Sequence, residues 1–347
     1  MSLVNVHNEW DPVEELIVGT AMHAAMPQED KGFNVIQKAS HDLFESLSPG
    51  KIPQKIIDET EEDIQLFIDE LMKLKIKVVR PEPIEFKGTF KTLDWEAEYY
   101  FSYCPRDILL AIGDTIIETP NVFRSRYFET SGYKNILLRY LQSGANWVSA
   151  PKPRLMDHGY NEEDPNQSVL RNLEPVFDAA NIIRAGRDIF YLVSDSGNEL
   201  GCQWLQQFLD RDYTVHPCRN LYSSMHIDST ICLLRPGLAL VNPSRVTENN
   251  LPGVLKQWDL LMAPEMVEYK YSNLGSFSTV WLGMNLLMLS PDLAVVDKHQ
   301  IPLIKLLEKN GIDTIPLALR HGRTLGGGFH CITLDVRRKG KLEKYFS

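Results

Sequence analysis

The segment Asp178-AANIIRAGRDIFYLVSDSG-Asn198 contains two apolar runs that are separated by Gly186-Arg187-Asp188. Apolar runs joined by a short turn containing glycine and aspartate are typical of β-hairpins. The pattern recurs in three other segments: Asp107-ILLAIGDTIIETP-Asn121, Asp228-STICLLRPGLALVNPS-Arg245 and Thr279-VWLGMNLLMLSPDLAVVD-Lys298. The chain therefore contains four predicted hairpins of one kind.

Amphipathic helices accompany the hairpins, and a short strand follows each of these helices. Apolar residues at spacings of three and four predict helices over 126–142, 198–209 and 300–309. After two of them, Trp147-Val148 and Tyr213-Thr214-Val215 predict single strands. The repeating unit is therefore hairpin, helix, strand.

The two ends of the chain supply lone strands that we expect to pair. A strand over 15–19 precedes a strongly amphipathic helix over 53–74 and a second strand over 76–79. The segment 331–337 also predicts a lone strand. Pairing it with 15–19 would complete a fifth hairpin and close a ring of sheets without free edges.

We therefore predict an α/β fold made of five repeated units that share one core, in a single domain over residues 1–347. Two ordinary α/β domains are the alternative, which the length of the chain also allows.

The composition excludes several classes of protein. The chain is 44% hydrophobic and 24% charged, with a formal net charge of -10, so it should not bind nucleic acid. No stretch approaches the roughly 20 apolar residues that span a bilayer, and the first residues do not resemble a signal peptide. The five scattered cysteines form no Cys-x-x-Cys pair, which argues against disulfides and a zinc site and predicts a reduced, cytoplasmic protein.

Cys331 is the candidate nucleophile. It lies between a three-glycine run and a β-branched run in Leu325-GGGFHCITLDVR-Arg338, so its thiol should sit at the mouth of a rigid strand beside flexible backbone. A buried structural thiol is the alternative. His330 should point to the opposite face of the strand and have a structural role.

Each predicted hairpin begins with a polar side chain at the head of its first strand. Equivalent positions in a ring converge on its axis, so the recurrence of these polar side chains predicts one shared site. Taken singly, each acid would be a cap or turn residue. The residues are Asp107, Asp178, Asp228 with His226 just before it, Ser278-Thr279, and Cys331.

Three carboxylates that face one thiol favour a planar cation such as a guanidinium, which carboxylates bind in bidentate pairs. A metal fits less well, because one histidine among acids and a thiol is not a familiar ligand set. Cys331 would attack the central carbon of the guanidinium. His226 would protonate the departing amine, and Asp178 would orient its imidazole.

Six ordered segments resemble the amidinotransferases, the family of glycine amidinotransferase and inosamine-phosphate amidinotransferase. They are Cys104-PRD-Ile108, Ala150-PKPR-Leu155, Phe177-DAANIIRAGRD-Ile189, Met225-HIDST-Ile231, Asn242-PSR-Val246 and Gly326-GGFHC-Ile332. The resemblance spans nearly the whole chain. It implies a five-bladed α/β propeller of ββαβ modules, of the pentein type, with no metal or organic cofactor. It also implies L-arginine as the donor, release of ornithine and a ping-pong cycle through an amidino-cysteine.

The resemblance also implies roles for individual residues. Cys331 would be the nucleophile, His226 the acid and base, and Asp178 its partner. The substrate-binding positions would be Asp107 and Asp228 for the guanidino group, Arg245 for the α-carboxylate of the donor, and Ser223, Met225, Ser278 and Thr279 around them. Family members are often dimers, so a homodimer is expected, although no segment marks an interface.

The acceptor amine is inferred from the resemblance of individual segments to one branch of the family. Segments 194–202, 213–220 and 224–238 are most similar to the bacterial inosamine-phosphate enzymes, which implies an acceptor of the scyllo-inosamine 4-phosphate type. Ser223 stands where glycine enzymes usually carry Asn, which weakens but does not remove a glycine or small-amine acceptor. An arginine deiminase-type hydrolase and an inactive guanidine-binding protein are further alternatives. Residues 212–225 are expected to form a lid that excludes water.

Overall fold

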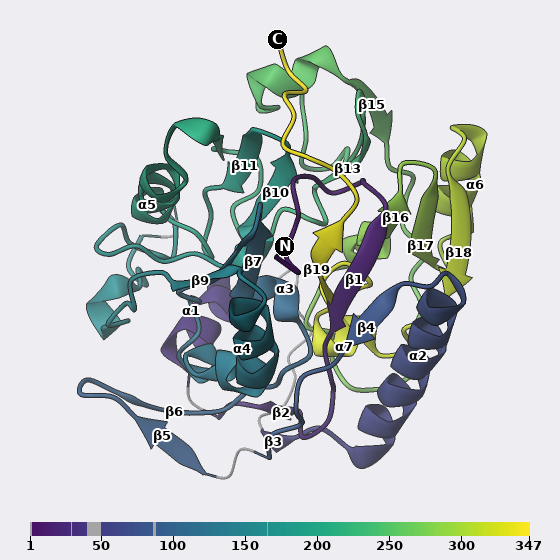
Figure 1. Ribbon diagram of the computed structural model, residues 1–347. Helices are drawn as coiled ribbons and strands as arrows, with labels where there is room; N and C mark the ends of the chain where they lie inside the picture. Colours follow the sequence, from purple (N-terminus) through teal and green to yellow (C-terminus); the bar gives the residue numbers. More distant parts are fainter. Residues whose placement is uncertain (1, 29, 40–49, 86–87, 165) are drawn as a thin grey trace.

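The structure is a computed structural model that describes residues 2–28, 30–39, 50–85, 88–164 and 166–347 (Figure 1). Its strands and helices alternate along the chain, which confirms the α/β class. The strands in these ranges form five three-stranded sheets and two two-stranded sheets.

Four of the three-stranded sheets are built from consecutive strands. In each, the first two strands pair in antiparallel fashion and the third pairs parallel to the second. The four predicted hairpins are therefore present, and a parallel strand follows each. The first strand of the last hairpin begins later than predicted, because Val280–Met284 form a 3-10 turn, η7. The sheets are β7 (Leu109–Ile112), β8 (Thr115–Glu118) and β9 (Asn146–Ser149); β10 (Ile182–Ala185), β11 (Asp188–Leu192) and β12 (Thr214–Cys218); β13 (Ile231–Arg235), β14 (Leu238–Val241) and β15 (Asp259–Met262); and β16 (Leu287–Ser290), β17 (Leu293–Asp297) and β18 (Asp313–Leu317).

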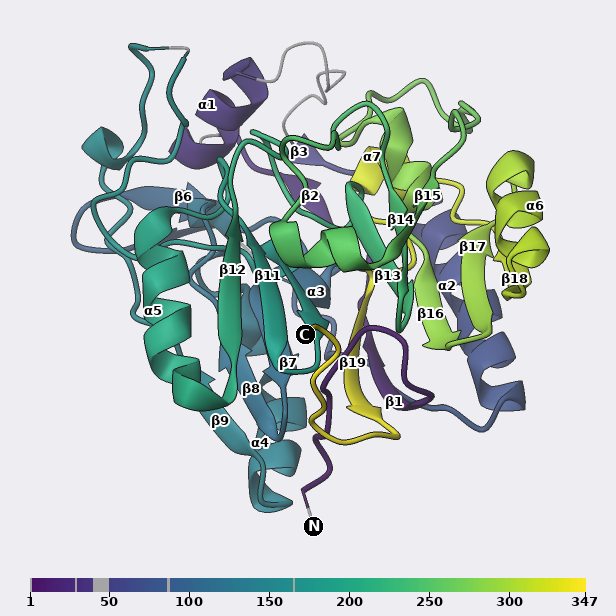
Figure 2. The same cartoon turned by 90° about the horizontal axis from the view of Figure 1, so that it is seen from above.

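The fifth three-stranded sheet joins the two ends of the chain. β1 (Val13–Val18) pairs with β19 (Thr333–Arg338) in antiparallel fashion and with β4 (Lys77–Val79) in parallel fashion. Figures 1 and 2 both show β1 and β19 side by side. The expected pairing of the terminal strands is confirmed, and this sheet has the same pattern as the other four.

Three of the longer helices lie outside the sheets. α2 (Gln54–Lys73), α5 (Glu199–Leu209) and α6 (Ile301–Lys309) stand at the periphery of the molecule in Figure 1. α2 buries a face that includes Ile64, Phe67 and Leu71, as its spacing predicted. Asn198 caps α5, because its side chain accepts a hydrogen bond from the backbone nitrogen of Gly201.

The helix expected over 126–142 is shorter than predicted. Two 3-10 turns, η1 (Arg124–Arg126) and η2 (Glu129–Tyr133), precede α4 (Lys134–Gln142). The guanidinium of Arg126 turns into the interior, where it pairs with Asp107 and Glu129. Tertiary ion pairing has therefore overridden the helical periodicity of this segment.

The remaining elements are short. They are β2 (Ala25–Met26), α1 (Lys31–Ala39), β3 (Gly50–Lys51), β5 (Thr89–Lys91), β6 (Glu96–Glu98), α3 (Pro105–Ile108), η3 (Asp157–Gly159), η4 (Ala179–Asn181), η5 (Asp210–Asp212), η6 (Gly253–Gln257), η7 (Val280–Met284) and α7 (Gly322–Leu325). Within the described ranges, no helix is long and apolar enough to cross a membrane.

Candidate active site

Cys331 lies in a turn just before β19 and not in the strand itself. Asn285 fixes this turn, because its Oδ1 accepts hydrogen bonds from the backbone nitrogens of His330, at 3.0 Å, and Cys331, at 3.1 Å. The glycines make this approach possible. A Cβ atom on Gly328 would lie 2.6 Å from Asn285 Oδ1, and one on Gly327 would lie 2.6 Å from the sulfur of Cys104.

A buried network of charged side chains supports the turn from behind. Arg106 Nε donates to the carbonyl oxygens of His330, at 3.0 Å, and Thr333, at 2.9 Å, while its Nη2 bonds Asp335 Oδ1 at 2.7 Å. Arg184 pairs with both Asp335 and Glu9. Burial raises the pKa of Asp335, but Arg184, Arg338 and Arg106 together hold it well below its usual range. The turn is therefore anchored to rigid, ionised groups.

His226 is bonded to Asp178, as expected. The two atoms His226 Nε2 and Asp178 Oδ2 are 2.9 Å apart, and His226 Nδ1 lies 3.8 Å from Asp107 Oδ1. Burial lowers the pKa of His226, but Asp107 and Asp178 outweigh it and raise the pKa to about 9. The imidazole is thus protonated at neutral pH. His226 also has a φ of 63°, in the left-handed region that few residues other than glycine adopt.

Asp107 has one carboxylate oxygen that can accept a hydrogen bond from a ligand. Its Oδ2 pairs with Arg126 Nη1 at 2.6 Å, whereas its Oδ1 is buried and has no hydrogen-bond partner among the described residues. A buried carboxylate oxygen without a donor is costly, so this oxygen is suited to receive an N–H group from a ligand. Arg126 had not been predicted as part of the site, because it lay inside the expected helix.

Asp228 bonds both Cys331 and the neighbouring histidine. Its Oδ2 accepts from His330 Nδ1 at 2.9 Å and from Cys331 Sγ at 3.3 Å. The prediction that His330 would point away from Cys331 was wrong, because both residues lie in a turn, where strand alternation does not apply. Burial would raise the pKa of Asp228, but His330 lowers it to about 2.

The thiol of Cys331 is protonated in the resting site. Burial, and next the charge of Asp228, raise the pKa of this thiol well above its usual value. This direction is the one expected from an acidic neighbourhood. A cation placed between Asp228 and Cys331 would oppose both effects, since it offsets the negative charge and stabilises a thiolate.

A cavity of about 60 Å³, the inner cavity, brings most of the predicted site residues together. Asp178 lies behind His226 and is fully buried, and Ser223 lines a neighbouring cavity instead. Within the described ranges, no group of three or more His, Cys, Asp or Glu side chains is arranged to hold a metal ion. The predicted residues that line the inner cavity are Asp107, Met225, His226, Asp228, Arg245, Ser278, Thr279 and Cys331.

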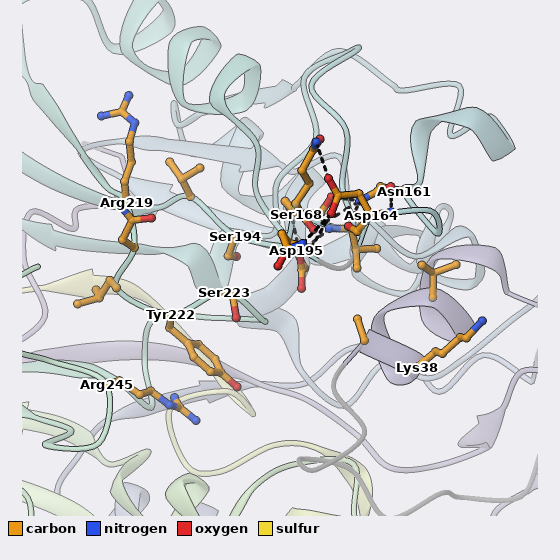
Figure 3. Close-up of a pocket in the computed structure, with 18 of the residues that line it drawn as sticks. Lys38, Asn161, Asp164, Ser168, Ser194, Asp195, Arg219, Tyr222, Ser223 and Arg245 are labelled. Atoms are coloured by element: carbon orange, nitrogen blue, oxygen red, sulfur yellow. Dashed lines mark hydrogen bonds between the residues drawn. The ribbon is translucent and has the colours of Figure 1, made fainter.

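A much larger space, the outer cavity of about 1040 Å³, adjoins the inner cavity (Figure 3). Tyr222 and Arg245 line both cavities. The guanidinium of Arg245 stacks 3.6 Å from the centre of the Tyr222 ring and donates to the hydroxyls of Ser229, at 3.0 Å, and Thr230, at 2.9 Å. No sequence pattern had indicated the contribution of Tyr222, since a single aromatic residue in a loop carries no periodic signal.

Comparisons with known proteins cover the whole chain. It is 52% identical over 346 residues to inosamine-phosphate amidinotransferase 1 of Streptomyces glaucescens, and the match covers 99% of each protein. It is 37% identical over 348 residues to the L-arginine:L-lysine amidinotransferase of Pseudomonas savastanoi pv. phaseolicola, covering 98% of this chain and 95% of that protein. The solved structure of the inosamine-phosphate amidinotransferase of Streptomyces griseus matches with a TM-score of 0.96 at 52% identity and covers 100% of both chains. No protein-family model matches the chain.

Proposed function

This chain belongs to the amidinotransferase family, and from that premise we propose that it transfers the amidino group of L-arginine to a phosphorylated inosamine through Cys331. The observation that carries the proposal is the inner cavity. There, Cys331, His226, Asp107 and Asp228 surround a space that contains one buried carboxylate oxygen without a hydrogen bond among the described residues, and Arg245 lines both this cavity and the outer cavity.

The donor would lie across the inner cavity. Its guanidinium would take the place between Asp107 and Asp228, because carboxylates bind the planar N–H fork in bidentate pairs. Its α-carboxylate would lie on Arg245, whose guanidinium is bonded to neutral hydroxyls and not to an acid among the described residues. This orientation brings the central guanidinium carbon to the sulfur of Cys331.

The first half-reaction forms the amidino-cysteine. Binding of the cation lowers the pKa of Cys331, so the thiol loses its proton to solvent as the substrate enters, and the thiolate attacks the guanidinium carbon while His226 keeps its own proton. The bond from this carbon to the δ-nitrogen then breaks, and His226 gives its proton to that nitrogen, so that ornithine leaves as a neutral amine group. Asp178, at 2.9 Å from His226, positions the imidazole and stabilises its protonated form.

The second half-reaction reverses these steps with another amine. The now neutral His226 takes a proton from the acceptor amine, whose nitrogen attacks the amidino carbon and displaces the sulfur. Water must be kept out, because it would hydrolyse the intermediate. We propose residues 219–225 as the lid, since β12 occupies 214–218 of the segment first expected to move.

The fold offers a simple frame for this chemistry. We propose that the five three-stranded sheets are the blades of a five-bladed α/β propeller of the pentein type in one domain over residues 1–347. The shared sheet pattern and the pairing of β1 with β19 support this arrangement. Asp107, Asp178, Asp228, Thr279 and Cys331 then precede the first strands of successive blades, which accounts for their convergence.

The experiment that tests the function is an acceptor screen with arginine as donor. Purified protein is incubated with scyllo-inosamine 4-phosphate, glycine, lysine or no amine, and products are identified by mass spectrometry. We expect ornithine release that depends on the inosamine phosphate. The 37% identity to an arginine:lysine enzyme makes a small amine the second candidate. Release of citrulline would indicate hydrolysis instead, and arginine binding without any product would indicate an inactive binding protein.

A further inference from the structure

Arg245 is placed to act on more than one substrate. It lines both cavities, and in Figure 3 it lies beside Tyr222 at the edge of the outer cavity. Among the residues that the structure describes, no carboxylate forms an ion pair with it, and burial lowers its pKa although Tyr222 and the charge of Asp228 act in the opposite direction. An underpaired and largely buried guanidinium favours an anion.

The other cations around the two cavities are less suited to this role. Arg126 is neutralised by Asp107 and Glu129, and Arg219 makes two hydrogen bonds to Glu199, at 2.5 Å and 2.8 Å. Lys38 is exposed on α1, and Figure 3 shows it far across the outer cavity from Arg245. Arg245 is thus the cation best placed to bind the anionic group of a substrate whose amine lies at Cys331.

The reach of the two substrates is matched. In the ornithine part of the donor, four carbon atoms separate the δ-nitrogen from the carboxylate carbon. In a six-membered cyclitol with its amine opposite its phosphate, four ring carbons separate the nitrogen from the phosphate ester oxygen along either side. A molecule whose amine lies at Cys331 therefore carries its anion at a similar reach in both cases.

The order of a ping-pong reaction leaves this place vacant when it is needed. Ornithine departs before the acceptor binds, so the cation that held the donor's carboxylate is free for a second anion. We propose that Arg245 binds the α-carboxylate of the donor in the first half-reaction and the phosphate of the acceptor in the second. This inference rests on the proposed function and identifies the phosphate contact within the same site.

The surroundings of Arg245 suit a phosphate on the outer side. Ser223 lines the outer cavity next to Tyr222, and its hydroxyl makes no hydrogen bond with the described residues. Phosphate carries more acceptor oxygens than carboxylate, so it has groups left for such a donor after bonding the guanidinium. Ser223 is exposed in the outer cavity, so its hydroxyl is available as such a donor.

The first test needs no knowledge of the natural acceptor. Binding of arginine and of agmatine, which lacks the carboxylate, is measured by calorimetry on the Cys331→Ala protein with and without inorganic phosphate. We expect phosphate to weaken the binding of arginine several-fold and to leave the binding of agmatine nearly unchanged. In Cys331→Ala/Arg245→Gln, phosphate should affect neither. Equal sensitivity of arginine and agmatine, or a phosphate effect that survives Arg245→Gln, would overturn the shared site.

The second test isolates the acceptor step. The enzyme is loaded with the amidino group from agmatine, so that the donor's carboxylate plays no part, and is then chased with scyllo-inosamine 4-phosphate or with unphosphorylated scyllo-inosamine. Arg245→Gln should raise the KM for the phosphorylated amine about tenfold, the usual scale for loss of one charged contact. It should change the KM for the unphosphorylated amine little. Arg187→Gln, which removes an exposed arginine paired with Asp212, is the matched control.

The outcomes separate this inference from the proposed function. If Arg219→Gln or Lys38→Gln, and not Arg245→Gln, selectively impairs the phosphorylated amine, the phosphate lies elsewhere and the inference is wrong. If the wild-type enzyme transfers to neither inosamine, the proposed acceptor is wrong, whereas the competition between phosphate and arginine still decides whether Arg245 accepts both kinds of anion.

Discussion

Replacing Asp178 with Asn should lower the pKa of His226 and shift the pH dependence of ornithine release. The substitution preserves the size of the side chain and an oxygen that can accept from His226 Nε2, 2.9 Å away, but it removes the charge. Asp178 is fully buried, so the substitution changes the electrostatics of the site and exposes no new surface.

The size of the effect follows from the wild-type site. The pKa of His226 is about 9 against an ordinary 6.5, since Asp107 and Asp178 outweigh the cost of burial. Loss of an opposite charge at this distance lowers a pKa by roughly 1–3 units, and we take about 2, which brings His226 to near 7. Because the imidazolium is lost as pH rises through its pKa, at pH 8 it would fall from about 90% to about 10% of molecules.

Single-turnover ornithine release, measured from pH 6 to pH 10, would report this loss of the proton donor. We expect the descending limb of the pH–rate profile to move down by about 2 pH units in Asp178→Asn. The rate at pH 8 should fall about tenfold, and the rate at pH 6 should change little. NMR titration of the His226 ring gives the pKa directly. Asp188→Asn is the matched control, because it removes the charge from a similar pair with His216, at 2.7 Å, outside the site. An unchanged His226 titration in Asp178→Asn would show that the charge of Asp178 does not raise the pKa of His226.

Three further perturbations test other parts of the site. Cys331→Ala should abolish turnover while arginine binding, measured by calorimetry, is largely retained; residual turnover above about 1% would argue against a covalent cycle. Gly327→Ala places a methyl group 2.6 Å from the Cys104 sulfur, so urea unfolding should show a loss of about 1–3 kcal/mol, and adding Cys104→Ala should recover part of it. Iodoacetamide should alkylate Cys331 slowly in the resting enzyme, because burial and Asp228 raise the pKa of its thiol. His330→Asn should change that rate, since His330 bonds Asp228 at 2.9 Å; an identical rate would contradict a link from His330 to the thiol through Asp228.

The sequence carried most of the information about the strands. Hairpin turns such as Gly113-Asp114 and Pro236-Gly237 are short-range signals, and each predicted hairpin is present. The pairing of β1 with β19 is a contact between the two ends of the chain, yet it was predictable because a lone strand at each end completes a repeated pattern. Repetition supplied the long-range information that periodicity alone lacks.

The parts that could not be predicted depend on tertiary contacts. Arg126 fitted a helical pattern, but its pairing with Asp107 and Glu129 holds the segment in 3-10 turns. The turn that carries Cys331 is set by Asn285, which is far away in the sequence, and so His330 faces Asp228 rather than the opposite side. Such single hydrogen bonds leave no trace in the spacing of residues.

The sequence also did not indicate which side chains pair with the carboxylates of the site. Three acids around a thiol suggested a strongly negative pocket. In the structure, Asp107 is paired with Arg126, Asp178 with His226, and Asp228 with His330. Two of the three carboxylates therefore face a cation, so the site presents to a guanidinium a set of oriented oxygens more than a large net charge.

Intact-protein mass spectrometry after rapid mixing with arginine, in the absence of any acceptor, examines the covalent step itself. We expect an added mass of one carbon, two nitrogens and two hydrogens, which peptide mapping places on Cys331 and which disappears when the acceptor amine is supplied. Ornithine formed at full rate in the presence of acceptor, with Cys331 never modified at any time point, would contradict a covalent step at Cys331.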